Sequence, residues 1–173
     1  MQNALCHLEK IITVNDILPE DITEITVKLS SLADLPLWKT TDVKTHTQAQ
    51  FSAPFVFSVA AHRIKTGPAW QSEATLGDRR IHEFMKKVRL ITDLDDNAGI
   101  RPEVEVVTGN RANKKTYFEV GISPKYEMTD DDIVDKFKRN SSMLLNDDQA
   151  QKVMADIQAL EDIGDISQML TTI

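Results

Sequence analysis

The first apolar residues along the chain follow the period of a helix. They recur every three or four residues within residues 4–15 and would share one face: Leu5, Leu8, Ile11 and Ile12. After the turn at Pro19 the period changes to two, which predicts a strand over residues 22–29. Residues 32–48 show neither period and are rich in threonine, so we expect a loop there.

A second helix is predicted from about Phe51. Apolar residues fill almost every position of residues 53–61, and a helix that is apolar on all sides is a buried one. Ser52 is its expected N-cap, and Pro54 is tolerated because it falls in the first turn. A shorter helix is predicted over residues 78–87, with Asp78 as its N-cap.

The remaining strands are expected between residues 88 and 122. One covers residues 88–91, and two more flank the turn at Gly109, where alternating apolar residues predict a hairpin. Helices and strands do not alternate regularly along the chain. The order of elements therefore favours an α+β fold, with an antiparallel sheet packed against helices and followed by C-terminal helices.

Two polar clusters predict helix starts in the last third of the chain. Thr129 precedes three aspartates, which suit the positive end of a helix dipole, and Asn146 with Gln149 forms a capping-box pattern. One apolar stripe follows: Ala150, Val153, Ile157, Leu160, Ile163 and Ile166. This stripe needs a partner surface, so we expect the chain to form a homo-oligomer.

Charge and composition exclude several kinds of protein. The net charge is −7, and residues 127–173 carry all of it, with 11 acidic against four basic side chains. Nucleic acid is therefore not an expected partner. The single cysteine, Cys6, cannot form an internal disulfide, and the longest apolar run, residues 53–61, is too short for a bilayer. We expect a soluble, cytoplasmic protein with no membrane partner.

The chain offers little chemistry of its own. Its histidines stand apart from other metal-ligating residues: His7, His46, His62 and His82. None has metal-ligand spacing, and no glycine pattern for phosphate binding occurs, so neither a metal nor a cofactor is expected. His46 comes just before the helix predicted from Phe51, which makes it the histidine best placed for a functional role.

Five stretches follow one another in an order that points to a family. They are residues 19–27 (PEDITEITV), 49–55 (AQFSAPF), 81–93 (IHEFMKKVRLITD), Lys136-Phe137, and 160–162 with 165–170. Together they resemble the C-terminal part of the MmgE/PrpD family. That family includes 2-methylcitrate dehydratases, cis-aconitate decarboxylases and an iminodisuccinate epimerase.

The resemblance implies a division of the chain. Family members pair a large helical domain with a smaller α+β lid, and their last helices return to the helical part. Residues 1–18 would then be a lead-in helix and residues 19–125 the lid-like domain. Residues 126–173 would be helices that pack on a helical domain absent from this sequence.

The resemblance also implies a substrate cleft. The family's Gln-Phe-Ser-x-Pro-Tyr stretch, whose tyrosine faces the substrate, corresponds to residues 50–55 here. Gln50, Ser52 and Phe55 would line the cleft, with His46 as a further candidate, and Phe55 lacks the hydroxyl of the family tyrosine. The family's catalytic histidines and lysines lie mostly in the helical domain, so no catalytic residue is assigned in this chain.

Two functional hypotheses result. The first is the lid portion of a lyase or isomerase that acts on a small di- or tricarboxylate. The reaction would be a dehydration, a decarboxylation or an epimerisation, alpha to a carboxylate group. Such a portion would be inactive alone and would bind substrate only when the helical domain completes it. The alternative is a non-catalytic α+β interaction or oligomerisation module.

Overall fold

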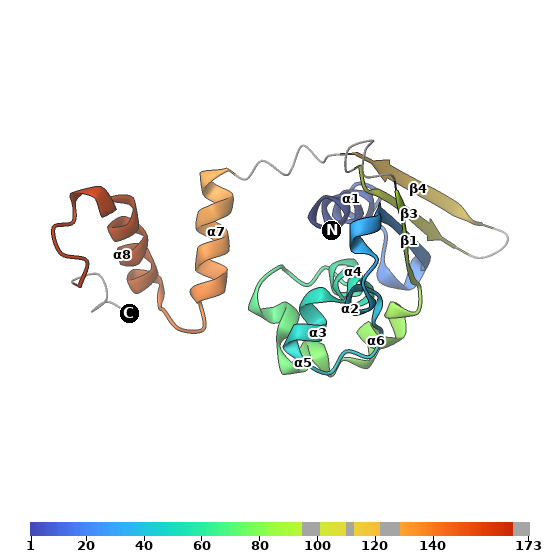
Figure 1. The fold of residues 1–173 in the computed structure, drawn as a ribbon, viewed down its shortest axis with the longest axis horizontal. Helices are drawn as coiled ribbons and strands as arrows, with labels where there is room; N and C mark the ends of the chain where they lie inside the picture. The colour runs from blue at the N-terminus through green and yellow to red at the C-terminus, as the bar shows by residue number, and fades with distance from the viewer. Residues whose placement is uncertain (95–100, 110–112, 122–128, 168–173) are drawn as a thin grey trace. The chain divides into compact units, whose positions relative to one another are not determined.

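The computed structural model describes residues 1–94, 101–109, 113–121 and 129–167 (Figure 1). The chain divides into two compact units, Met1–Tyr126 and Glu127–Ile173. No helix within the described ranges has the length and apolarity needed to cross a membrane.

A four-stranded sheet forms one layer of the first unit. Its strands are β1 (Ile22–Ser30), β2 (Val88–Leu94), β3 (Glu103–Thr108) and β4 (Lys115–Val120), in the spatial order β2-β1-β3-β4. The β3–β4 hairpin and the β1–β3 pair are antiparallel, as predicted. The predicted α+β class is confirmed.

The pairing of β1 with β2 corrects the expectation of an antiparallel sheet, because these two strands run parallel. The chain between them passes through several helices before it returns to the sheet. A parallel pair needs a long crossover of this kind, whereas an antiparallel pair can be joined by a tight turn. Alternating apolar residues identify a strand but carry no information on its direction.

Two helices cover one face of the sheet (Figure 1). The helix α1 (Gln2–Val14) packs on β3 and β4, and α4 (Ala53–Ala61) packs on β2 and against α1. The apolar side chains of β1 and β3 that face these helices are fully buried: Ile25, Val27, Val104 and Val106. All nine residues of α4 are buried as well, so the prediction of a buried helix is confirmed.

A buried histidine joins the first helix to the end of the sheet. The Nε2 of His7 donates a hydrogen bond to the carbonyl oxygen of Gly121 over 2.8 Å. Lys10, on the same helix, forms a 2.7 Å ion pair with Glu119 of β4. The middle of α1 and the end of the sheet at β4 are therefore held together.

The segment between β1 and β2 is mostly helical. After the 3₁₀ turn η2 (Ser31–Ala33) it contains α2 (Pro36–Lys39), α3 (His46–Phe51), α4, α5 (Glu73–Leu76) and α6 (Arg79–Met85). The expectation of a loop over residues 32–48 is wrong for α2 and for the start of α3. A capping box between Thr45 and Gln48 begins α3, and this local signal is visible in the sequence.

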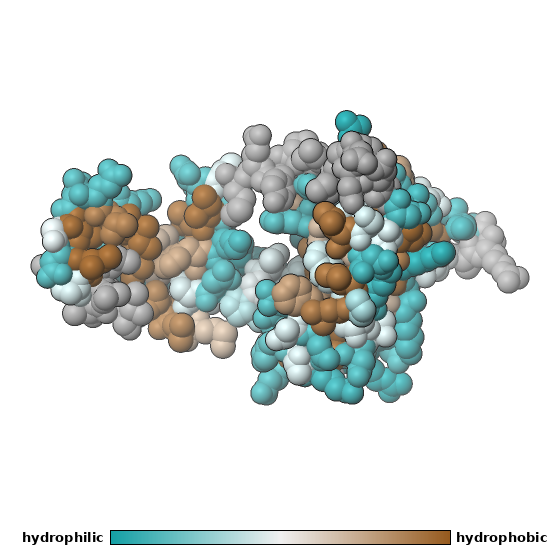
Figure 2. Space-filling view, in the orientation of Figure 1, coloured by the Kyte–Doolittle hydropathy of each residue, from teal (hydrophilic) through white to brown (hydrophobic). Residues whose placement is uncertain are grey.

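The second unit consists of α7 (Asp130–Ser141), α8 (Asp147–Gln158) and the 3₁₀ turn η6 (Leu160–Asp162). Thr129 and Asn146 form the predicted caps, each completed by a side chain three residues later. Ala150 and Val153 of the apolar stripe are buried, but Ile157, Leu160 and Ile166 remain 47%, 46% and 57% exposed. Figure 2 shows hydrophobic side chains gathered on the visible face of this unit.

The N-cap of α6 gives a prediction on pH. The Asp78 carboxylate accepts hydrogen bonds from the backbone N–H of Arg80 at 2.8 Å and from its guanidinium at 2.7 Å. The guanidinium bond, followed by the backbone bond, lowers the pKa of Asp78 from 3.8 to about 2. A folded-state pKa below the unfolded value means that the ionised group stabilises the fold above pH 4, and that this contribution is lost as the pH falls toward 2.

We therefore expect Asp78→Asn to be less stable than the wild type at pH 5, with a gap that narrows as the pH approaches 2. Asp78→Ala removes the cap as well as the charge. Its free energy of unfolding should therefore be about 1 kcal/mol lower than that of Asp78→Asn at every pH. Urea titrations of the three proteins between pH 2 and 6 measure both effects. The prediction would be wrong if the free energy of unfolding of the wild type exceeded that of Asp78→Asn by the same amount at pH 5 and at pH 2.

Candidate functional site

His46 and Gln50 lie together on the surface of α3. They stand four residues apart, which makes them neighbours on one face of the helix, and both are exposed. The helix begins at His46 because Thr45 and Gln48 cap each other: the Gln48 N–H donates to the Thr45 hydroxyl, and the Thr45 N–H donates to the Gln48 side-chain oxygen. The cap thus fixes the orientation of the face that carries His46 and Gln50.

Ser52 joins α3 to α4. It is buried, and its hydroxyl donates to the carbonyl oxygen of Thr40 at 2.6 Å while accepting from the N–H of Phe55 at 3.2 Å. The second bond confirms the predicted N-cap of α4. Both hydrogen-bonding roles of the hydroxyl are therefore used inside the unit. Direct contact between Ser52 and a substrate stays a prediction.

Phe55 lies in a small core of its own. Its side chain is only 1% exposed, and it belongs to a cluster with Val43, Ala49, Val59, Ile81 and Met85. Its ring lies 6.4 Å from the His82 ring, centroid to centroid, at 59°. In the described unit, Phe55 thus supports the surface rather than forming it, and its contact with a substrate stays a prediction.

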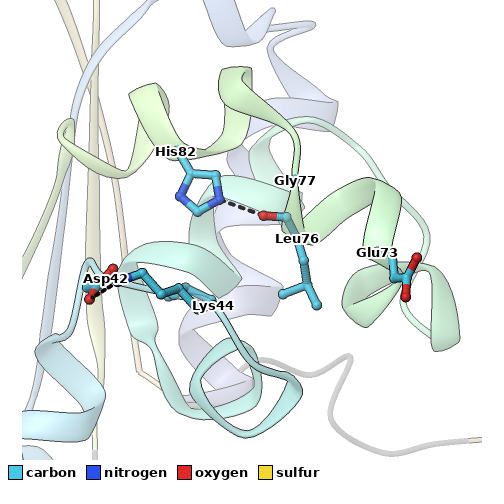
Figure 3. A pocket seen from close by; sticks show the side chains of 7 residues that line it. Asp42, Lys44, Glu73, Leu76, Gly77 and His82 are labelled. Carbon is cyan, nitrogen blue, oxygen red and sulfur yellow. Dashed lines mark hydrogen bonds and ion pairs between the residues drawn. The ribbon is translucent and has the colours of Figure 1, made fainter.

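A shallow groove of about 570 Å³ lies over this cluster (Figure 3). It lies between the segment before α3 and the helices α5 and α6, and its lining residues are Asp42, Val43, Lys44, Glu73, Leu76, Gly77 and His82. The Nε2 of His82 donates to the carbonyl oxygen of Leu76 at 2.7 Å. In the neutral ring, this bond leaves Nδ1 as the hydrogen-bond acceptor.

Lys44 brings a positive charge to the groove, whereas the carboxylates of Asp42 and Glu73 in the same lining oppose the binding of an anion. The ammonium group of Lys44 forms a 2.9 Å ion pair with Asp42, and the Lys44 side chain is 73% exposed. Its remaining donor positions can hydrogen-bond a carboxylate, but solvent and salt weaken an exposed ion pair strongly. No group of three or more metal-ligating side chains occurs among the residues that the structure describes.

No residue that lines this groove was given a functional role from the sequence, and His82 was named there without one, as one of four separated histidines. Lys44 and His82 are 38 positions apart in the chain, and only the packing of α6 beside α4 brings their segments together. No local motif signals such an arrangement.

The burial of Phe55 predicts the outcome of restoring the family tyrosine. Phe55→Tyr adds a hydroxyl inside a closed cluster, which costs about 1–3 kcal/mol when the group finds no partner. The control Phe51→Tyr makes the same change on a partly exposed ring and should alter stability by less than about 0.5 kcal/mol. Urea titrations compare the two variants with the wild type. A stable Phe55→Tyr would mean that the position opens toward solvent or a substrate.

Comparison with known proteins agrees with these observations. A family model described as the MmgE/PrpD C-terminal domain matches residues 1–161 of this 173-residue chain. No curated protein matches the sequence. The match extends over α1, the sheet, the groove and most of the second unit. The chain belongs to the MmgE/PrpD family and represents its C-terminal domain.

Proposed function

We propose that this chain is the lid portion of an enzyme that acts on a small di- or tricarboxylate and that it is inactive without a helical domain. The observation that carries this proposal is the family match over residues 1–161. The reaction would begin with removal of a proton alpha to a carboxylate. Loss of water, loss of carbon dioxide or return of the proton to the opposite face would follow.

In this proposal the surface formed by α3 and the adjoining groove faces the substrate. Gln50 supplies an amide and His46 an imidazole from one exposed helix face, and Lys44 supplies a positive charge two residues earlier. Hydrogen bonds to a charged carboxylate are stronger than those between neutral groups. The lid would hold a substrate carboxylate, while Ser52 and Phe55 keep α3 and α4 in place beneath it.

The chemical step would need groups from outside this chain. A general base must lie within hydrogen-bond reach of the proton that it removes and must be held in position. His46 and Lys44 are both exposed to solvent in the described unit, where bulk water competes for every interaction. A second domain that closes over this surface would exclude that water and strengthen each contact.

The alternative, a non-catalytic interaction module, also has an observation in its favour. Ile157, Leu160 and Ile166 are exposed in the second unit, and large exposed apolar groups are typical of surfaces that contact another protein. C-terminal helices that pack on a helical domain in the complete enzyme would leave the same residues exposed when that domain is absent. Activity assays in the presence of a helical domain separate the two functions.

We expect the isolated chain to show no turnover of 2-methylcitrate, cis-aconitate or iminodisuccinate near neutral pH. Addition of the separately expressed helical domain of an MmgE/PrpD enzyme should produce turnover of at least one of them. The double variant His46→Ala/Gln50→Ala should then lower the rate roughly tenfold or more, because two contacts to the substrate are lost.

The control Gln151→Ala removes an exposed glutamine from α8 and should leave the rate unchanged. Turnover that persists through repurification of the isolated chain would show that no helical domain is needed. A reconstituted rate that His46→Ala/Gln50→Ala does not alter would disprove the role of the α3 face. A mixture that turns over none of the three compounds would favour the interaction module.

A further inference from the structure

The strand β4 forms one edge of the sheet. In the strand order β2-β1-β3-β4 it is the last strand, and in the described part of the chain it forms backbone hydrogen bonds with β3 (Figure 1). Alternate residues along the outer side of such a strand present backbone N–H and C=O groups to the surroundings. These groups can form hydrogen bonds with another strand.

Two features that commonly protect edge strands, a proline and a β-bulge, are missing from β4, although the strand carries the charged residues Lys115 and Glu119. The strand, Lys115–Val120, contains no proline or glycine, and its six-residue register with β3 runs without a bulge. Phe118 and Val120 lie on the same side of the strand and are 53% and 51% exposed. An edge of this kind is favourable for pairing with a further strand.

The charges on β4 are complementary to those of a second, antiparallel copy. If Tyr117 lies on the two-fold axis, Lys115 of each copy stands directly opposite Glu119 of the other. The ion pair with Lys10 uses Oε1 of Glu119, and within the described residues Oε2 is left for the second copy's Lys115. A parallel, in-register pair would instead place lysine opposite lysine and glutamate opposite glutamate, which is destabilising.

The other face of β4 is complementary in the same register. Phe118 stands opposite Thr116 of the second copy, and the two Phe118 side chains become diagonal neighbours about 7–8 Å apart, within reach of aromatic rings. Both rings, now exposed, would cover each other. One register thus pairs opposite charges on one face and brings the two Phe118 side chains together on the opposite face.

We propose that β4 pairs with β4 of a second copy of this chain, antiparallel about Tyr117, and joins the two sheets into one. This proposal does not depend on the proposed enzymatic function. It concerns an interface on the sheet edge, separate from the α3 face and from the apolar stripe of α8. The interface is isologous, since each copy contributes the same residues.

Disulfide trapping of the full chain tests the register. In a Cys6→Ser background, Tyr117→Cys places two cysteines opposite each other, with Cα atoms about 4.5–5.5 Å apart, as a disulfide requires. Mild oxidation should therefore link the chain into dimers. Lys115→Cys should not link to itself, because its two copies lie about 13 Å apart along the strands. Lys115→Cys mixed with Glu119→Cys should link.

Charge reversal tests the same interface at equilibrium. Sedimentation of the full chain should show a dimer, and Lys115→Glu should weaken it roughly tenfold because two attractive pairs become repulsive. The double variant Lys115→Glu/Glu119→Lys restores opposite charges and should recover much of the association. Arg79→Glu makes the same charge change at an exposed position on α6, outside the paired strands, and should have little effect.

Circular dichroism of each variant checks that the sheet still folds. A chain that stays monomeric at high concentration would overturn the proposal. A dimer that Tyr117→Cys does not trap would overturn it too, and would place the contact elsewhere, with the exposed stripe of α8 as the next surface to test.

Discussion

Burial of α4 on all sides is the constraint on which the first unit depends. Ala53, Phe57, Ala60 and Ala61 of this helix belong to the core that contacts the sheet and α1. Phe55 and Val59 belong to the separate cluster beneath the groove. One helix of nine residues therefore connects two cores, and small alanine side chains on one side allow close approach to its neighbours. A change in the position of α4 would move both the sheet layer and the candidate site.

Local signals in the sequence were sufficient to predict much of this architecture. The caps Ser52, Asp78, Thr129 and Asn146 are all present, because an N-cap depends on a side chain and the backbone only two or three residues away. The buried character of α4 also followed from composition alone. The predicted start near Phe51 merges the end of α3 with the start of α4, since Ser52 interrupts the helix for a single residue.

Features that depend on distant parts of the chain were not predictable in this way. The parallel direction of β2 is set by the path of the helices that precede it, and the groove depends on how α6 packs. Of the proposed site residues, His46 and Gln50 lie on the surface and Ser52 and Phe55 lie inside. The family motif places these residues close together in sequence, but a helix start turns neighbouring side chains in different directions.

The hydrogen bond from His7 to Gly121 has a consequence for how the first unit connects to other parts of a protein. These residues are 114 positions apart, yet they are in direct contact, so a residue of the first helix lies beside the last described residue of the unit. A unit with adjacent ends can be inserted into a loop of a host protein without stretching either connection. Its ends could also be joined by a short linker and the chain reopened elsewhere, which would preserve both cores in a circularly permuted form.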